Sequence, residues 1–153
     1  MASGPGRVAL VNTEDRKTGV KVSLKALQLN PVKGNQVLIK PNFNTADVPP
    51  GSTHNDTRVA LIEEIWALGA KSVSRGERSY PPTQEVMEQK GVLPILEKLN
   101  VRVIDFDHLN QKDWVELQPK GSHWPHGFRI ARPVLEAECL VSTGCLKTHQ
   151  LGG

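Results

Sequence analysis

The sequence predicts an α/β fold: a three-layer, mostly parallel, Rossmann-like sheet with an inserted β-hairpin. Short apolar runs rich in β-branched residues recur along the chain, as in strands that are buried on both faces. Segments with apolar residues at helical spacing lie between most of these runs. Strands that alternate with helices in this way indicate βαβ units around a parallel sheet.

The first two predicted elements are a strand and a helix. Residues 8–11 (Val-Ala-Leu-Val) form a continuous apolar run, which predicts a buried strand. Thr18 is suited to cap a helix with apolar residues at helical spacing, and Pro31 marks the end of that segment.

A second strand, a long polar connection and a second helix follow. Residues 37–39 (Val-Leu-Ile) predict the strand, and residues 41–54 contain almost no side chains suited to core packing. Most βα connections need only a few residues, so the length of this one suggests a function. Asn55 or Asp56 is expected to cap the helix, and Gly69 is expected to end it.

The third and fourth predicted strands enclose a broken helix. Residues 71–75 predict the third strand and residues 101–104 the fourth. Between them, a helix that begins at Thr83 is expected to break at Gly91 and to resume through Leu99.

A hairpin interrupts the alternation before the last strand. Residues 114–117 and 127–130 predict the two hairpin strands, and residues 118–126 predict the loop between them. Residues 139–142 (Cys-Leu-Val-Ser) predict the last buried strand.

The domain prediction follows from the end of this pattern. A parallel strand needs a helix on its face, and residues 143–153 do not have the pattern of a helix. We therefore expect a single α/β domain over residues 7–153 that is truncated at its C-terminus, preceded by a flexible stretch at residues 1–6.

Composition excludes several classes of protein. The 153 residues carry a formal net charge of +3 with charges of both signs mixed along the chain, which argues against a nucleic-acid-binding stripe. No apolar run approaches the roughly 20 residues of a membrane span, and the start has no cationic-then-apolar signal. Two cysteines are too few for a small disulfide scaffold. We expect a cytoplasmic protein, and its oligomeric state stays open.

The polar clusters of the sequence follow the ends of the predicted strands. In open α/β sheets, ligands bind outside the carboxyl ends of the strands, so all these clusters are expected at one rim. Solvated loops explain most of them. They explain Lys40 less well, because Pro41 restricts the backbone before it and thereby directs the lysine.

These polar segments resemble the domain-of-unknown-function family 362. The resemblance runs from about Val8 to Gly153, and its most specific marks are Lys-Pro-Asn (40–42) and Lys-Thr-His (147–149). It also includes the segments Gly-Ser-Thr-His-Asn-Asp (51–56), Gly-Glu-Arg-Ser (76–79) and Gly-Ser-His-Trp (121–124).

The resemblance implies that this chain is the N-terminal portion of a longer protein. Relatives continue into a Lys-Asn motif, and many carry a ferredoxin-like run of cysteines, which implies an iron–sulfur cluster in a missing C-terminal part. Cys139 and Cys145 cannot supply four close thiolates, so we expect no cofactor in this chain itself.

Two lysines and two histidines are the first candidates for the chemistry. Lys40 can hold a carboxylate or phosphate as a point charge, and Lys147 can do the same or, if desolvated, act as a base or nucleophile. His54 and His149 are candidates for proton transfer. Each could instead have an ordinary role, as an exposed or paired lysine or as a capping histidine.

Further ligand-binding candidates surround them. Asn42, Asn44 and Asn55 can orient a polar ligand or close Asx-turns, and Thr148 lies between the last lysine and histidine. Glu77 is placed like the acidic residue that holds a ribose in dinucleotide folds, but the glycine fingerprint for phosphate is missing. Arg75 and Arg78 could pair with Glu77 at the surface.

Metal and cysteine chemistry are the weaker interpretations. His123 and His126 lie in a loop rich in glycine and proline, and a zinc site usually shows two spaced pairs of ligands, so we predict no metal site. Cys145 and His149 could form a nucleophile pair, but an unreactive cysteine is the better expectation.

The sequence favours an enzyme domain of undetermined reaction class that binds a small carboxylate or phosphate. The free N–H groups at the start of the 55–68 helix would complete the anion pocket. A redox module that depends on a missing iron–sulfur part and a non-catalytic interaction domain remain the alternatives.

Overall fold

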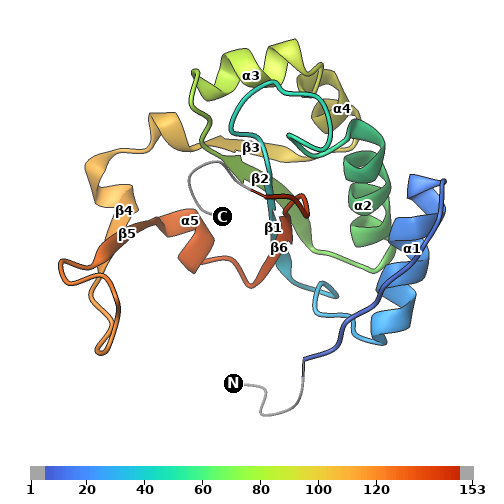
Figure 1. Ribbon diagram of the computed structural model, residues 1–153, viewed down its shortest axis with the longest axis horizontal. Coiled ribbons are helices and arrows are strands. Elements are labelled where there is room, and N and C mark those ends of the chain that lie inside the picture. The colour runs from blue at the N-terminus through green and yellow to red at the C-terminus, as the bar shows by residue number, and fades with distance from the viewer. Residues whose placement is uncertain (1–5, 149–153) are drawn as a thin grey trace.

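The main sheet has four parallel strands. The computed structural model describes residues 6–148. Within them, the strand order is β3-β2-β1-β6 (Figure 1). The strands are β1 (Gln36–Pro41), β2 (Ser72–Glu77), β3 (Arg102–Asp105) and β6 (Cys139–Thr143). Because they are parallel, their carboxyl ends meet at one edge, which we call the C-terminal edge.

One face of the sheet is covered by four helices. These are α1 (Arg16–Leu27), α2 (Asn55–Ala67), α3 (Thr83–Gln89) and α4 (Leu93–Lys98), and they lie on the same side of the sheet in Figure 1. The alternation of the strands directs Val37 and Ile39 of β1 and Val73 of β2 into this core. Ile62 and Ile65 of α2 pack against them at helical spacing.

The opposite face is covered by much shorter elements. They are the 3₁₀ turns η1 (Phe106–His108) and η2 (Gln111–Asp113), the hairpin β4 (Trp114–Leu117) and β5 (Phe128–Ala131), and the short α5 (Arg132–Leu135). Phe106 packs directly on Gly76 of β2, where a Cβ atom would lie 2.4 Å from Phe106 Cζ. Gly76 is therefore needed for this close approach.

The predicted fold class is confirmed. The molecule is mixed α/β, with a parallel sheet flanked by helices and a separate antiparallel pair, β4 and β5. The break between α3 and α4 falls at Gly91, which has a positive φ of 59°. Gly69 follows α2 with φ of 89°, as expected for a helix stop.

The predicted strand at residues 8–11 is wrong. This segment is irregular and pairs with no strand, and Val8 and Leu10 are 92% and 97% exposed. Arg7 Nη1 donates to Leu27 O at 2.9 Å, so the segment is held beside α1. A run of four apolar residues is compatible with a strand but does not make one, and this segment does not pair with the free edge of β6.

Two predicted helix caps are also corrected. Asp15, not Thr18, is the N-cap of α1, and its carboxylate accepts from the backbone N–H groups of Lys17 and Thr18. His54, not Asn55 or Asp56, is the N-cap of α2. In the part of the chain that the structure describes, no helix is both long and apolar enough to cross a membrane.

Candidate functional site

The loop after β1 is fastened to the C-terminal edge by Glu77. Glu77 ends β2 and is 2% exposed. Its Oε1 accepts from Lys40 Nζ at 2.6 Å and from the Arg78 backbone N–H at 2.9 Å, and its Oε2 accepts from the Phe43 backbone N–H at 3.2 Å. The structure thus brings Lys40 and Glu77 together as an ion pair, and Arg78 pairs with Asp107 at 3.3 Å instead.

The far end of the same loop is fastened to β6. Thr53 Oγ1 accepts from the Asn42 backbone N–H at 3.1 Å and donates to Thr143 O at 2.9 Å. The Thr53 backbone N–H donates to Asn42 O at 3.1 Å. The loop therefore leaves β1 and returns beside it, so that the beginning of α2 lies next to the ends of both β1 and β6.

The two predicted asparagines of this loop contribute through their backbone. Asn42 O accepts from Thr53, and Asn44 O accepts from the Tyr80 backbone N–H at 2.7 Å. Within residues 6–148, neither side-chain amide has a hydrogen-bond partner. Asn55 differs, because its Oδ1 accepts from Arg58 Nη1 at 2.8 Å and its Nδ2 donates to Lys90 O at 3.0 Å. Its amide is already engaged within the protein.

His54 caps α2 with its ring. Its Nδ1 accepts from the Asp56 backbone N–H at 3.1 Å. A ring nitrogen that accepts carries no proton, so the neutral imidazole has its proton on Nε2. In this tautomer His54 can donate a hydrogen bond to a ligand oxygen from Nε2, but that nitrogen has no lone pair with which to take a proton. The geometry suits holding an anion better than general-base catalysis.

The predicted residues after β6 form the least fastened part of the site. Lys147 and Thr148 are exposed, and neither side chain makes a hydrogen bond or ion pair with the described residues. His149 lies outside the described residues, as do residues 1–5 of the N-terminal stretch expected to be flexible. The structure therefore gives the positions of Lys147 and Thr148 among the three predicted residues of this segment.

A groove runs along this part of the C-terminal edge, and we call it the α2 groove. It has a volume of about 780 Å³ and lies between α1, the beginning of α2 and the end of β6. Among the described residues, its charged or titratable lining is Arg16, His54 and Cys145, with no carboxylate. Its other lining includes the hydroxyl residues Ser23, Ser52, Thr53, Thr57, Ser142 and Thr143 and the apolar residues Val20, Leu24, Leu61 and Val141.

Sequence reasoning missed a second group of cations, which we call the arginine cluster: Arg58, Arg75 and Lys90 around the ring of Phe43. The Cζ atoms of Arg58 and Arg75 lie 4.3 and 4.8 Å from the ring centroid, and Lys90 Nζ lies 5.3 Å from it. Arg58 and Arg75 are 2% and 1% exposed. No carboxylate of the described residues lies within 4 Å of any of the three cationic groups.

Burial changes the protonation equilibria of this cluster. Burial, together with the smaller effect of the Arg75 charge, lowers the pKa of Arg58 to about 9. Burial also lowers the pKa of Arg75 to about 10, while Glu77 and Asp105 act in the opposite direction. Burial and the charge of Arg58 lower the pKa of Lys90, against Asp47 and Cys145. Both arginines still carry a full charge at neutral pH.

The signals for these residues were present in the sequence. Arg58 lies four and seven residues before Ile62 and Ile65, so it belongs to the buried stripe of α2. Arg75 is two residues after Val73 and therefore faces the same core. Periodicity places both charges inside, but it does not show that they meet at Phe43.

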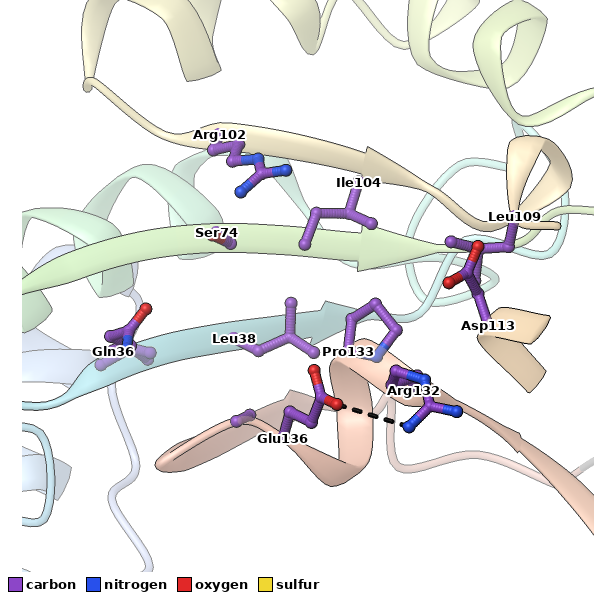
Figure 2. Close-up of a pocket in the computed structure, with 12 residues that line it drawn as sticks. Gln36, Leu38, Ser74, Arg102, Ile104, Leu109, Asp113, Arg132, Pro133 and Glu136 are labelled. Atoms are coloured by element: carbon purple, nitrogen blue, oxygen red, sulfur yellow. Dashed lines mark ion pairs between the residues drawn. The ribbon is translucent and has the colours of Figure 1, made fainter. Parts of the chain in front are cut away.

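A separate hollow of about 380 Å³ lies on the opposite face of the sheet, under α5. Figure 2 shows Leu38 and Ile104 on the sheet beneath it, and Arg132 paired with Glu136 at 3.5 Å along α5. None of the predicted site residues that the structure describes lines this hollow. It is therefore a different place from the candidate site.

A comparison with protein families decides the family. The model of the family described as Domain of unknown function (DUF362) matches residues 37–153, which is well over half of the chain. The chain belongs to the DUF362 family. No curated protein and no solved structure matches it. The match begins at β1, so it includes the loop after β1, the α2 N-terminus and the segment after β6.

The cysteines of this DUF362 chain do not fit an iron–sulfur cluster by themselves. Cys139 is buried in β6, where burial raises the pKa of its thiol, and Cys145 lies in the following segment. Two thiols are half of the four ligands that such a cluster needs. Within the described residues, no group of three or more His, Cys, Asp or Glu side chains is placed to hold a metal ion.

Proposed function

We propose that this chain is an enzyme domain that binds a small molecule with a carboxylate or phosphate group in the α2 groove. The observation that supports it most is the lining of the groove: Arg16, His54 and several hydroxyls without any carboxylate among the described residues. A volume of about 780 Å³ suits a metabolite-sized ligand, which such sites enclose in roughly 300–1,000 Å³.

The N-terminus of α2 supplies the second part of the proposed site. Its first backbone N–H groups and the positive end of the helix dipole favour an anion. His54 Nε2 and the hydroxyl groups can add directed hydrogen bonds, while Val20, Leu24 and Leu61 receive an apolar part of the ligand. Lys147 follows Leu146 of the groove lining and is the candidate to move a proton or to hold the anionic group.

Lys40 has a different role in this proposal from the free cation expected of it. Its Nζ is 2.6 Å from Glu77 and also donates to Pro41 O at 3.0 Å. The Lys40 side chain is 41% exposed and can still reach solvent, but its charge is largely balanced. Lys40 and Glu77 therefore support the loop. Asn42, Asn44 and Thr148 are predicted to contact a part of the ligand that extends beyond the lining of the α2 groove.

Thermal unfolding with added anions tests this function. Phosphate, malonate and citrate should each raise the Tm of the chain, because a ligand that binds only the folded state stabilises it. Arg16→Gln should weaken the binding by about tenfold, which corresponds to ~1.4 kcal/mol. Lys120→Gln, in the exposed hairpin loop, is the matched control and should bind as the unmodified chain does.

Two results would count against the proposal. One is the absence of any Tm increase with all three anions at millimolar concentration. The other is an equal increase in the chain and in its Arg16→Gln variant, which would place the binding outside the α2 groove.

A further inference from the structure

The arginine cluster contains buried donors that nothing in the described protein satisfies. Arg58 Nε, Arg75 Nε and Arg75 Nη2 have no hydrogen-bond partner there. The partners of the other guanidinium atoms are neutral: Thr53 O and Asn55 Oδ1 for Arg58, and Met87 Sδ for Arg75. A thioether is a weak acceptor, and buried guanidinium groups are normally paired with an anion.

The ring of Phe43 fills the place where such an anion would be expected. All three cationic groups lie within 5.3 Å of its centroid. The face of an aromatic ring carries partial negative charge and attracts cations, but it accepts far less from N–H donors than an oxyanion does. Phe43 is therefore an incomplete substitute for an anion.

Solvent reaches the cluster at Lys90. A second groove of about 450 Å³ is lined by Lys90, Asn55, Asp56 and residues of the loop after β1, including Ala46 and Val48, while Phe43, Arg58 and Arg75 do not line it. Lys90 Nζ donates to Asp47 O at 2.9 Å and to Ser52 Oγ at 2.6 Å, so it joins the loop to the groove. Figure 1 shows this loop arching between α2 and α3. The loop contains Phe43, so a movement of the loop would open the cluster.

We propose that the arginine cluster is an oxyanion receptor that Phe43 closes in the absence of ligand. A phosphate or carboxylate group would displace the ring, accept from the unpartnered guanidinium N–H groups and from Lys90, and carry the loop with it. Arg58, Arg75 and Lys90 do not line the α2 groove, although Arg58 and Lys90 donate to Thr53 and Ser52 of its lining, and none of the three contacts Arg16.

The receptor is tested by phosphate titration of variants that also carry Arg16→Gln, because this substitution weakens binding in the α2 groove. Phe43→Leu in that background should tighten phosphate binding by about tenfold, because a site that is open about a tenth of the time binds with a tenfold weaker apparent affinity. Phe106→Leu is the matched control, since Phe106 is also buried but packs on the opposite face of the sheet. It should leave the affinity unchanged.

Lys90→Gln tests the same receptor by removing one of its cations, which should weaken phosphate binding. Lys90 is half-buried at the groove, so this variant should fold, and it should weaken phosphate binding several-fold. Acetate and malonate in place of phosphate distinguish a receptor for carboxylates from one for phosphate. Binding of either class through Lys90 supports the proposal.

Hydrogen exchange adds a readout that does not depend on a folded variant of Phe43. The Phe43 N–H donates to Glu77 Oε2, so displacement of the ring should release this amide and speed exchange in a peptide covering residues 42–46. Equal phosphate affinities of the Phe43→Leu and Phe106→Leu variants would overturn the proposal. So would slower exchange at residues 42–46 on binding, or full affinity in Lys90→Gln.

Discussion

Two groups of charged side chains lie near the C-terminal edge, and they are built in opposite ways. In the first, Glu77 is buried and its carboxylate accepts hydrogen bonds from Lys40 Nζ and from the backbone N–H groups of Phe43 and Arg78. In the second, Arg58 and Arg75 are equally buried, yet their contacts are neutral acceptors and the ring of Phe43.

This difference indicates that the first group supports the loop and that the second group could bind an anion. A buried charge with all its hydrogen bonds made holds the surrounding backbone in one arrangement, and its removal leaves the donors unpaired. A buried charge without a counter-ion lowers stability until something binds to it. Phe43 belongs to both groups, because its backbone is fixed by Glu77 while its ring covers the arginines.

The largest expected effect on stability comes from removing the charge of Glu77, whose carboxylate is fully hydrogen-bonded. Glu77→Gln should lower the free energy of unfolding by about 2–3 kcal/mol, because the amide can no longer balance Lys40 and presents its own donors to buried N–H groups. Urea denaturation at neutral pH measures this change. Glu116→Gln, at the exposed position of β4, is the control and should change the free energy of unfolding by less than about 0.5 kcal/mol. A similar small change for both variants would show that Glu77 does not fasten the loop.

Removing a charge from the arginine cluster should raise the free energy of unfolding, whereas removing the charge of Glu77 lowers it. Arg75→Met removes a buried charge and places a side chain of similar volume beside Met87 and Phe43, so without added anions it should raise the free energy of unfolding by roughly 1 kcal/mol. Urea denaturation in a buffer of low ionic strength measures it. A loss of 2 kcal/mol or more would instead make Arg75 a supporting residue like Glu77.

Substitutions of His54 distinguish its role as the N-cap of α2 from a role in anion binding. His54→Ala removes the N-cap of α2 and should lower the free energy of unfolding by about 1 kcal/mol. His54→Asp restores a cap, so it should recover this stability but weaken anion binding by adding a negative charge to the α2 groove. Recovery of both stability and anion binding by His54→Asp would leave His54 with a capping role alone.

The smallest expected effect depends on pH and lies at the ion pair of Arg78 and Asp107. Burial raises the pKa of Asp107, but hydrogen bonds from Thr83 and the charge of Arg78 outweigh it and hold the pKa below the ordinary value of 3.8. Its contribution is therefore complete above that value and is lost as the pH falls through the lowered pKa. Asp107→Asn should cost less than about 1 kcal/mol at pH 7, and this cost should shrink as the pH falls below 3.8 in urea denaturation. A difference that does not change over this pH range would mean that charge is not its cause.

Much of the fold could be predicted because the spacing of apolar residues and the glycines that end helices indicate the same elements. β1 and β6 are continuous apolar runs, and the stops at Gly69 and Gly91 have the positive φ that favours glycine. The strand prediction for residues 8–11 was wrong because an apolar run does not show whether it pairs with a neighbouring strand. The cap at His54 was missed because capping preferences favour the asparagine and aspartate that follow it.

The positions of the candidate residues along the sheet were predictable, but their contacts were not. Parallel topology alone puts Lys40, Glu77 and Thr143 at one edge, and the structure shows them there. Pairing of Lys40 with Glu77, rather than of Arg78 with Glu77, depends on side-chain distances that one sequence does not contain. The meeting of Arg58 and Arg75 at Phe43 likewise needs α2, β2 and the loop to be placed together.

Urea denaturation of the chain and of Arg75→Met, each with and without 20 mM phosphate at constant ionic strength, tests the central claim most directly. We predict that Arg75→Met is the more stable protein without phosphate, and that phosphate stabilises the unmodified chain more than the variant. If phosphate raises the free energy of unfolding equally in both proteins, Arg75 is not part of an anion receptor.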